Sequence, residues 1–354
     1  MRLDAFTERV MRKNKSNQSR LPLTISAQYG LVDQITFFNK VVASTDLSNY
    51  YLLKKGEFAY NKSYSSDYPW GAIKRLDNYD QGALSSLYIC FAPQDNVVSD
   101  FILQYFESPK WHKGISEIAV EGARNHGLLN VAVQDFFHTY HYVSKDKKEQ
   151  IKISKLLMLL DERISTQNKI IDKLQSLIKG IAQKIVHSNK TNVRLSECVE
   201  CSSSTLQESD VCEHGAYPVY GANGIVGYLD NYNTKGEAVY IIKDGSGVGT
   251  VSYVTGKCSA TGTLNTLQAK EGYSLQYLYY LLKVFNFEPY KTGMAIPHIY
   301  FKDYGKAKFF CPSYIEQLQY AQSLSAIDSK LLVEKNILTS LSMQKQYLLR
   351  QMFI

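Results

Sequence analysis

Apolar side chains recur in alternating steps of four and three along a long segment in the middle of the chain. In residues 149–186 these positions are Ile153, Leu157, Leu160, Ile164, Ile171, Leu174, Ile178, Ile181 and Ile185. Gln167 fills the single gap in the series. This spacing predicts an amphipathic helix that winds around another helix.

The same pattern returns at the end of the chain, in residues 316–353. Its seam positions are Tyr320, Leu324, Ile327, Leu331, Leu338, Leu341, Lys345, Leu348 and Met352. Glu334 repeats the polar interruption, and Lys345 stands where an apolar residue is expected. Asp146 and Ser313 each precede a Glu by three residues, so both helices are expected to begin with a capping box.

The residues before each long helix also follow one plan. A strand-like stretch after a Lys-Gly-Glu turn (56–60 and 236–240) leads to an alternating run (83–91 and 261–268). A Ser-capped amphipathic helix (99–106 and 274–285) and a loop with Gly and His (122–127 and 293–298) follow. The order predicts an α+β protein with mixed domains at 1–145 and 191–312, and long helices at 146–190 and 313–354.

Two equal halves related by a pseudo-two-fold axis would pair their long helices in antiparallel fashion, as an intramolecular coiled coil. Gln167 and Glu334 would then meet near its centre, where a polar layer can set the register. The alternative is that each helix docks on its own domain, with both polar residues exposed. The expected seam comprises Ile153, Leu157, Leu160, Ile164, Gln167, Ile171, Leu174, Leu324, Ile327, Leu331, Glu334, Leu338 and Leu341.

Composition agrees with a folded protein, because 45% of residues are apolar and 21% are charged. No charged-then-apolar leader and no apolar run long enough for a membrane span is found, so neither a secretion signal nor a membrane partner is expected. The six cysteines form no matched framework, which indicates reduced thiols and a cytoplasmic location. The net charge of +7 permits nucleic acid as a partner.

Motifs for catalysis are missing from the sequence. The Gly-rich stretch 243–249 lacks a following helix that could bind a phosphate, which leaves a loop facing a large polyanion or a plain turn. Cys198, Cys201, Cys212 and His214 could hold zinc, but the last two are spaced too closely for the usual loop. His138 and His141 are expected on opposite faces of a strand at 136–143. We therefore predict no metal and no cofactor.

Polar residues cluster in loops at corresponding places of the two mixed domains. Lys and Arg suit phosphates, and Asn, Ser and Lys can read base edges, so these loops are candidates for DNA contacts. Solvated hairpin tips are the alternative. The candidates are Asn61, Lys62, Ser63, Tyr64, Ser65, Lys74, Arg75, Arg124, Asn125, His126, Lys243, Asp244, Ser246, Thr261, Thr263 and His298.

In this order and duplication the chain resembles the specificity subunit of type I restriction–modification systems, over essentially its whole length. In the first half the resemblance rests on residues 30–32, 37–40, 60–63, 69–73 and 82–88. In the second half it rests on Tyr217–Tyr228 and Lys243–Gly247. The entries to the long helices, Glu149-Gln150 and Pro312 with Glu316-Gln317, complete it.

The resemblance implies a DNA-binding subunit without catalytic activity of its own. Each mixed domain, as a target-recognition domain, would read one half of a split target in double-stranded DNA, while the helices set the spacing. Two modification subunits, which bring S-adenosylmethionine and methylate adenine, would dock on the subunit, and motor-nuclease restriction subunits could join. The two domains differ in length and loop residues, so an asymmetric target is expected.

Other classes of function stay open from the sequence. One is a stand-alone DNA-modifying enzyme, such as a nuclease or methyltransferase with divergent motifs. Another is a coiled-coil adapter that binds no DNA. A silent or phase-variable allele of the same family is a third possibility.

Overall fold

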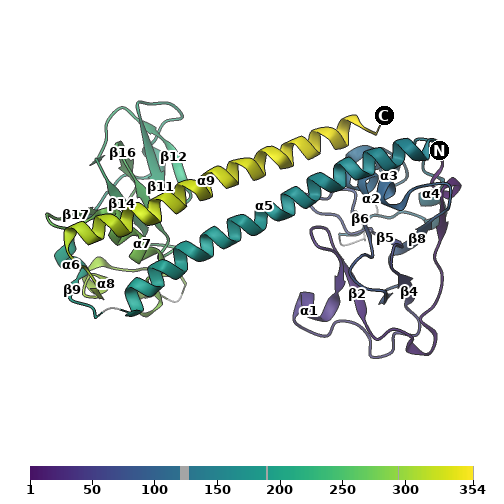
Figure 1. Cartoon of the computed structure of the whole chain (residues 1–354), viewed down its shortest axis with the longest axis horizontal. Helices are drawn as coiled ribbons and strands as arrows, with labels where there is room; N and C mark the ends of the chain where they lie inside the picture. The colour runs from purple at the N-terminus through teal and green to yellow at the C-terminus, as the bar shows by residue number, and fades with distance from the viewer. Residues whose placement is uncertain (120–126, 189, 294, 354) are drawn as a thin grey trace. The chain divides into compact units, whose positions relative to one another are not determined.

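The computed structural model describes residues 1–119, 127–188, 190–293 and 295–353. Unit 1 comprises Met1–Thr166 and Ile337–Ile354, and unit 2 comprises Gln167–Asn336. Two long helices, α5 (Lys147–Ser188) and α9 (Tyr314–Gln351), each contribute one part to either unit (Figure 1). Both boundaries between the units therefore fall inside a long helix. Within the described residues no helix is long and apolar enough to cross a membrane.

Unit 1 contains two four-stranded sheets. The first has the order β1 (Thr7–Arg9), β8 (Ile89–Pro93), β5 (Phe58–Asn61) and β6 (Ala72–Arg75), all antiparallel. The second has the order β3 (Gly30–Asp33), β2 (Pro22–Ser26), β7 (Gln81–Leu84) and β4 (Tyr51–Lys54), in which β2 and β7 are parallel. The helices are α1 (Gln34–Phe38), α2 (Ser99–Glu107), α3 (His112–Ile118) and α4 (Val133–His138), with 3-10 turns at Leu3–Ala5, Lys15–Asn17 and Pro109–Trp111.

Unit 2 repeats this construction. One antiparallel sheet has the order β10 (Val199–Ser203), β17 (Leu264–Ala269), β14 (Ala238–Ile242) and β15 (Val251–Val254). The other has the order β12 (Gly224–Leu229), β11 (Tyr217–Gly221), β16 (Lys257–Ala260) and β13 (Thr234–Lys235), in which β11 and β16 are parallel. β18 (Lys308–Phe309) pairs with β9 (Val193–Arg194). The helices are α6 (Leu195–Cys198), α7 (Leu275–Val284) and α8 (Phe301–Tyr304), with 3-10 turns at Glu208–Asp210 and Glu288–Tyr290.

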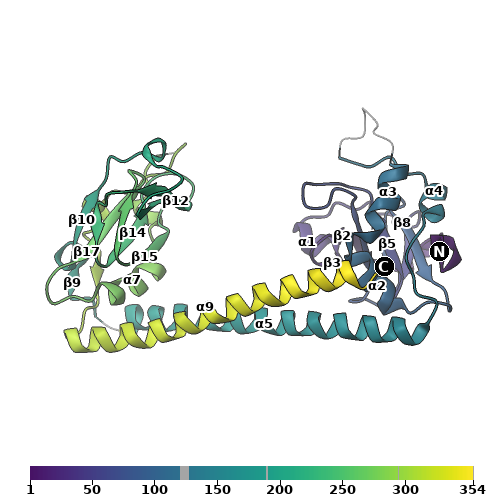
Figure 2. The same ribbon diagram turned by 90° about the horizontal axis from the view of Figure 1, so that it is seen from above.

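The parallel pair of strands occupies the middle of the second sheet in both units. In each unit one amphipathic helix, α2 or α7, lies beside the long helices (Figure 2). The predicted fold class is thus confirmed: two mixed domains on a pair of long antiparallel helices.

In unit 1 the long helices pack together and against α2. Ile153 and Leu157 of α5 share one buried cluster with Leu349 of α9 and with Phe353. The Phe353 ring lies 5.2 Å from the ring of Phe101 in α2. Further along, Asp161 of α5 accepts a bond from Lys345 of α9, so partner numbers fall as α5 numbers rise. The helices are therefore antiparallel, and Lys345 makes an ion pair at its seam position.

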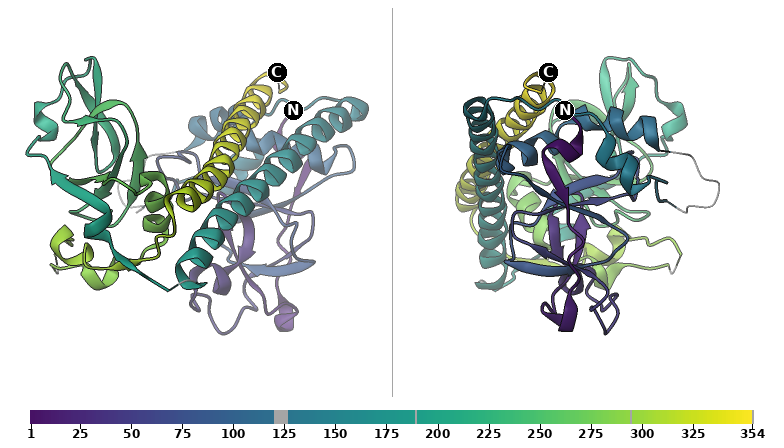
Figure 3. Two further views of the ribbon diagram at one scale, coloured as in Figure 1. Left: turned by 60° about the vertical axis from the view of Figure 1, so that its left-hand side comes forward. Right: turned by 90° about the vertical axis from the view of Figure 1, so that its right-hand side faces the viewer.

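In unit 2 the same two helices continue side by side, and their course can be followed in Figure 3. Gln167 of α5 donates from Nε2 to the backbone oxygen of Glu334 at 2.9 Å and also contacts its carboxylate. Both side chains are buried, with 8% and 6% of their surface exposed. Hydrogen bonds from Lys330 and then from Gln167 lower the pKa of Glu334. This geometry differs from the alternative in which both polar residues face solvent.

A buried glutamine fastens the mixed part of each unit to its long helix. In unit 1 the Gln150 side chain accepts from the backbone N–H of Val98, at the start of α2, at 2.7 Å. It also donates to the carbonyl of Ser144 at 2.7 Å. In unit 2 Gln317 accepts from the N–H of Ser274 at 3.0 Å and donates to the carbonyl of Pro312 at 2.9 Å. Each amide satisfies a helix-end donor that would otherwise be buried without a partner.

The starts of the long helices differ from the expected pair of capping boxes. At α9 the box is complete, because Glu316 N–H donates to Ser313 Oγ at 3.4 Å and Ser313 N–H donates to the Glu316 carboxylate at 3.1 Å. At α5 Asp146 accepts from the N–H of Lys148 at 2.8 Å, but the Glu149 carboxylate is taken by the Ser144 hydroxyl. Ser99 is not a cap either, since the residue before α2 is Val98.

Two sequence-based assignments of strands were wrong. The alternating run 83–91 is divided between β7 and β8, which belong to different sheets. Residues 136–143 do not form a strand, because α4 runs through His138. Only residues 136–138 of this segment lie on α4, and a segment of eight residues is too short to distinguish the period of a strand from that of a helix.

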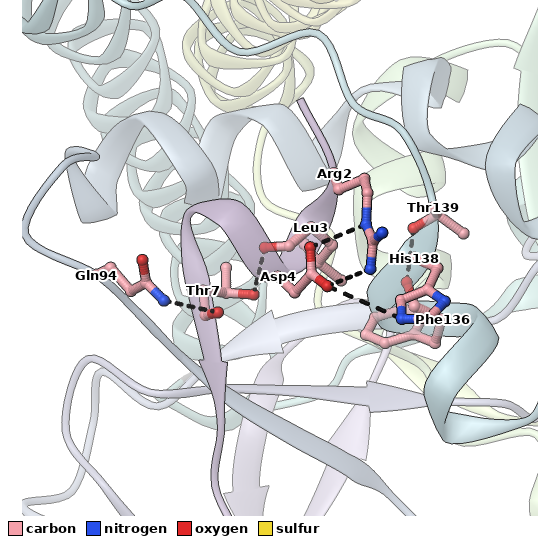
Figure 4. A network of polar contacts seen from close by, with 8 residues as sticks. All are labelled: Arg2, Leu3, Asp4, Thr7, Gln94, Phe136, His138 and Thr139. Carbon is pink, nitrogen blue, oxygen red and sulfur yellow. Dashed lines mark hydrogen bonds and ion pairs between the residues drawn. The ribbon is translucent and has the colours of Figure 1, made fainter.

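His138 and His141 therefore have different surroundings from those expected. His138 lies 3.9 Å from Asp4, within the network of polar contacts drawn in Figure 4. His141 is buried, with its ring nitrogens 3.1 Å from the Tyr105 hydroxyl and 2.7 Å from the Thr139 hydroxyl. Burial, with a smaller effect from the Met1 amine, lowers the pKa of His141 to about 3.

Unit 1 should lose stability as the pH falls below the usual histidine pKa. Between about pH 6.5 and pH 3 unfolded His141 binds a proton that the folded protein excludes, so stability decreases by about 2 kcal/mol at pH 5 relative to pH 7. Urea unfolding of His141→Gln should show a smaller loss between those pH values, whereas His138→Gln should resemble the native chain. Equal pH dependence in all three proteins would contradict this assignment.

Candidate nucleic-acid interface

Three loops of unit 2 that carry predicted DNA-contacting residues lie together. The loop after β14 begins with Lys243, whose N–H donates to the Thr263 carbonyl at 3.0 Å. The Lys243 carbonyl in turn accepts from the N–H of Ile299 at 2.9 Å, and Gly245 N–H donates to the Pro297 carbonyl at 3.0 Å. The segments 243–246, 261–263 and 297–299 are thus joined by backbone hydrogen bonds.

The side chains of this cluster of loops differ in burial and in hydrogen-bond partners. Asp244 pairs with Nδ1 of His298, and this contact orders the loop. Thr261 is fully buried and its hydroxyl lies 2.8 Å from that of Thr263, so it is unsuited to touch a ligand. Ser246 is exposed at the tip of the loop. Among the described residues no carboxylate forms an ion pair with the partly exposed Lys243. We therefore retain Lys243 and Ser246 as contact candidates and drop Thr261.

In unit 1 the candidate loop follows β5. Asn61 accepts from the N–H of Ser63 at 3.0 Å through its side chain, and Tyr64 is half exposed. Leu129 N–H donates to the Lys62 carbonyl at 2.9 Å, and Tyr64 N–H donates to the Gly127 carbonyl at 3.1 Å. The loop 61–65 therefore adjoins the residues that follow Arg124, Asn125 and His126, a triplet that lies outside the described residues.

Lys74 and Arg75, which were candidates for DNA contacts, form ion pairs within unit 1. Lys74 pairs with Glu107 at 2.6 Å, and Arg75 pairs with both Asp77 and Asp100 at 2.7 Å. Only 13% and 11% of their side-chain surfaces are exposed. Since Glu107 and Asp100 belong to α2, these pairs fasten α2 to β6. A charge that is already matched by carboxylates contributes little to attracting phosphates, so both residues leave the candidate set.

The two candidate loops occupy corresponding positions. β5 and β14 are the third strands of the corresponding sheets, and the loops 61–65 and 243–249 leave the carboxyl ends of these strands. Their residues differ, Asn-Lys-Ser-Tyr-Ser in one and Lys-Asp-Gly-Ser-Gly-Val-Gly in the other. The same scaffold therefore presents unlike side chains in the two units.

One further cluster in unit 2 was not found from the sequence. The Lys257 ammonium lies 5.0 Å from the ring of Tyr232 and 5.6 Å from that of Tyr217. Aromatic rings are suited to stack on bases, and an ammonium beside them can neutralise a phosphate. These three residues are far apart in the sequence, and no local pattern joins them.

The cysteines and histidine that could have held zinc are not brought together. Within the described part of the chain no group of three or more Cys, His, Asp or Glu side chains is placed to hold a metal ion. Cys198 is buried, whereas Cys212 is exposed on a segment that bridges to Tyr228 of β12. Burial raises the pKa of Cys201 to about 11, which does not favour the thiolate that a metal requires.

Comparison with protein families finds a match over residues 187–343, to the type I restriction modification DNA specificity domain. The chain is also 27% identical, over 113 residues, to the specificity subunit of the type I restriction enzyme EcoprrI of Escherichia coli. That alignment covers 32% of this chain and 28% of the relative, so sequence similarity reaches only part of either protein.

Solved structures are similar over the full length. The S subunit of a type I restriction–modification system from M. genitalium matches with a TM-score of 0.64 and 17% identity, covering 100% of this chain and 95% of that one. A structure described under complex assembly and conformational transition of the type I R-M system matches with a TM-score of 0.57 and 15% identity, covering 100% and 96%. At these identities the likeness shows the fold.

Lys243 and Lys74 provide a matched pair for testing the interface. Lys243→Gln should weaken binding to any duplex DNA and reduce the slope of log affinity against log salt by about one, because one phosphate contact is lost. Lys74→Gln should leave the slope unchanged, since its ammonium is held by Glu107. Fluorescence anisotropy of labelled duplex over a salt series measures both. An equal reduction for the two variants would refute the assignment.

Proposed function

We propose that this chain is a member of the type I restriction–modification DNA specificity family and recognises a bipartite and asymmetric target in cytoplasmic double-stranded DNA. Each mixed domain would read one half of the target through the loop that follows β5 or β14. The paired helices α5 and α9 would keep the two halves in register.

The observation that supports this proposal is the repeated scaffold with unlike loops. Both units have the same two sheet orders, the same parallel central pair and the same glutamine anchor. The loops 61–65 and 243–249 differ in sequence at corresponding positions. If the loops contact base edges, unlike side chains select unlike bases, and two different half-sites follow.

We further propose that two modification subunits dock on this chain and supply the chemistry. Those partners would bind S-adenosylmethionine and transfer its methyl group to adenine, which requires the base to leave the duplex. Motor-nuclease subunits would join in a restriction complex. The chain itself would position DNA without catalysing a reaction, as the description of its relative as a specificity subunit favours.

The rival classes make different predictions. A stand-alone DNA-modifying enzyme would turn over DNA with labelled S-adenosylmethionine or with magnesium in the absence of any partner. A coiled-coil adapter without a DNA role would show no salt-dependent binding to duplex. The proposed specificity subunit binds duplex with a steep salt dependence and is inactive alone.

Exchange of residues 191–311 for the equivalent part of a related chain should replace one half-site and preserve the other. The reason is that the retained loop 61–65 would still read its own half. Sequencing of methylated DNA from a host that expresses the chimera with its modification partner identifies both halves. Exchange of residues 1–145 is the control and should change only the opposite half. A chimera in which both half-sites change would contradict the proposal that each mixed domain reads one half-site.

Lengthening both long helices by one turn should enlarge the unspecific spacer of the target. One turn adds about 5.4 Å, which corresponds to one or two base pairs at about 3.4 Å each. The half-sites should stay as they are, and the same sequencing of methylated DNA reads the spacer. Insertion into α5 alone is the control, because it displaces Gln167 from Glu334. This variant should reduce the methylation of the target by the modification partner. New half-sites with an unchanged spacer would count against this function of the helices.

A further inference from the structure

Two buried thiols of unit 2 lie side by side where the chain enters and leaves its mixed domain. Cys198 is the last residue of α6, and Cys311 lies between β18 and the start of α9. Their Sγ atoms are 3.9 Å apart. Cys198 is fully buried and Cys311 has 7% of its surface exposed. All six cysteines are free thiols, and among the contacts described no other two are sulfur to sulfur.

The backbone around both residues is held on each side. The Asn192 side chain accepts from the N–H of Cys311 at 2.9 Å and donates to its carbonyl at 2.7 Å. The adjacent β9 and β18 pair Val193 with Phe309. On the other side, the Cys198 carbonyl accepts from the N–H of Lys270 at 2.9 Å. The two thiols are thus kept in proximity by the fold, which favours an intramolecular reaction.

The other buried cysteines provide a contrast. Cys258 lies 3.2 Å from the Tyr240 hydroxyl, and Cys90 is packed in an apolar cluster of unit 1. Neither contacts a second thiol. A cysteine that serves only as a small apolar side chain has no need of a sulfur neighbour, so the pairing of Cys198 with Cys311 requires another explanation.

We propose that Cys198 and Cys311 form a redox-responsive dithiol that closes to an intrachain disulfide when a peroxide oxidises the protein. A disulfide bond is about 2.05 Å long, so the sulfur atoms, 3.9 Å apart, must approach by about 2 Å. This inference concerns the stability of unit 2 and does not rest on the proposed DNA function.

The reaction balances with hydrogen peroxide as the oxidant. The Cys311 thiolate attacks one peroxide oxygen, the O–O bond breaks, and Cys311 becomes a sulfenic acid while hydroxide leaves. The hydroxide takes up the proton that the Cys311 thiol lost on ionising, which gives the first water. The Cys198 sulfur then attacks the Cys311 sulfur, the S–O bond breaks, and the second water leaves with the Cys198 proton. Two thiols thereby lose two electrons to one peroxide, and a thiol reductant reverses the bond.

Cys311 is the better first nucleophile of the two. A hydrogen bond from the Cys198 thiol lowers the pKa of Cys311, although burial opposes the effect. The pKa of Cys198 is raised by the same contact and by its burial. Cys198 also has the Arg194 carbonyl as an acceptor at 3.3 Å. Cys311 is therefore the thiol of this pair that ionises more readily.

The bond would tie together the two chain connections of the mixed domain. Cys198 directly precedes β10, an edge strand of the sheet that contains β14, and Cys311 lies in the short link between β18 and α9. The disulfide would enclose all of the strands from β10 to β18 in one covalent loop. Closing a long loop restricts the unfolded chain and stabilises the folded one.

Oxidation of the full chain tests the proposal. Treatment with hydrogen peroxide should lower the intact mass by about 2 Da, the loss of two hydrogens on disulfide formation. Peptide mapping without reductant should join the peptides that contain Cys198 and Cys311. The melting temperature should rise by about 5–10 °C. Dithiothreitol should reverse all three changes.

Variants separate this pair from general thiol oxidation. Cys198→Ser and Cys311→Ser should abolish the cross-linked peptide and the rise in melting temperature, while Cys90→Ser and Cys201→Ser should retain both. Peptide mapping of the oxidised native chain shows whether Cys198 and Cys311 are joined, even if a variant fails to fold. Recovery of Cys198 and Cys311 as free thiols after oxidation, or their conversion to sulfinic acids without a cross-link, would overturn the proposal.

Discussion

The structure depends on how a mixed domain is joined to a long helix, and in both units a buried glutamine makes that join. Gln150 and Gln317 stand at the same place near the start of α5 and α9, and each has 1% of its surface exposed. The side-chain carbonyl of each accepts from the N–H of the residue that precedes an amphipathic helix, and the side-chain NH2 donates to the loop before the long helix. A buried amide that loses either partner costs about 1–3 kcal/mol, so this geometry fixes the orientation of the domain on its helix.

This constraint leaves the loops free to differ. The sheet orders, the parallel central strands and the position of α2 or α7 follow the same plan in both units. The loops after β5 and β14 begin at corresponding strand ends and share no side-chain pattern. A scaffold anchored in this way can carry unlike recognition loops without altering the helix pair. The similarity of residues 187–343 to a type I restriction modification DNA specificity domain is consistent with this division.

The long helices could be predicted from the sequence because a heptad pattern over many turns is a strong signal, and the α+β class followed from the duplicated order of elements. Short elements were less predictable. Residues 136–143 looked like a strand because Phe136, His138 and Tyr140 alternate with other residues, yet α4 buries Phe136 and Phe137 together. The ion pairs of Lys74 and Arg75, which were candidates for DNA contacts, could not be predicted because their partners Glu107 and Asp100 are distant in sequence. The function of Gln150 and Gln317 was likewise hidden, since it depends on the partner helix.

Sequencing of methylated bases across the genome of a host that expresses this chain with the proposed modification partner tests the central claim most directly. The account predicts a single motif with two unlike specific halves, separated by a spacer of fixed length, and with adenine as the modified base. The motif should vanish when the gene for this chain is deleted. A continuous or palindromic motif, or one that persists without this chain, would contradict the account.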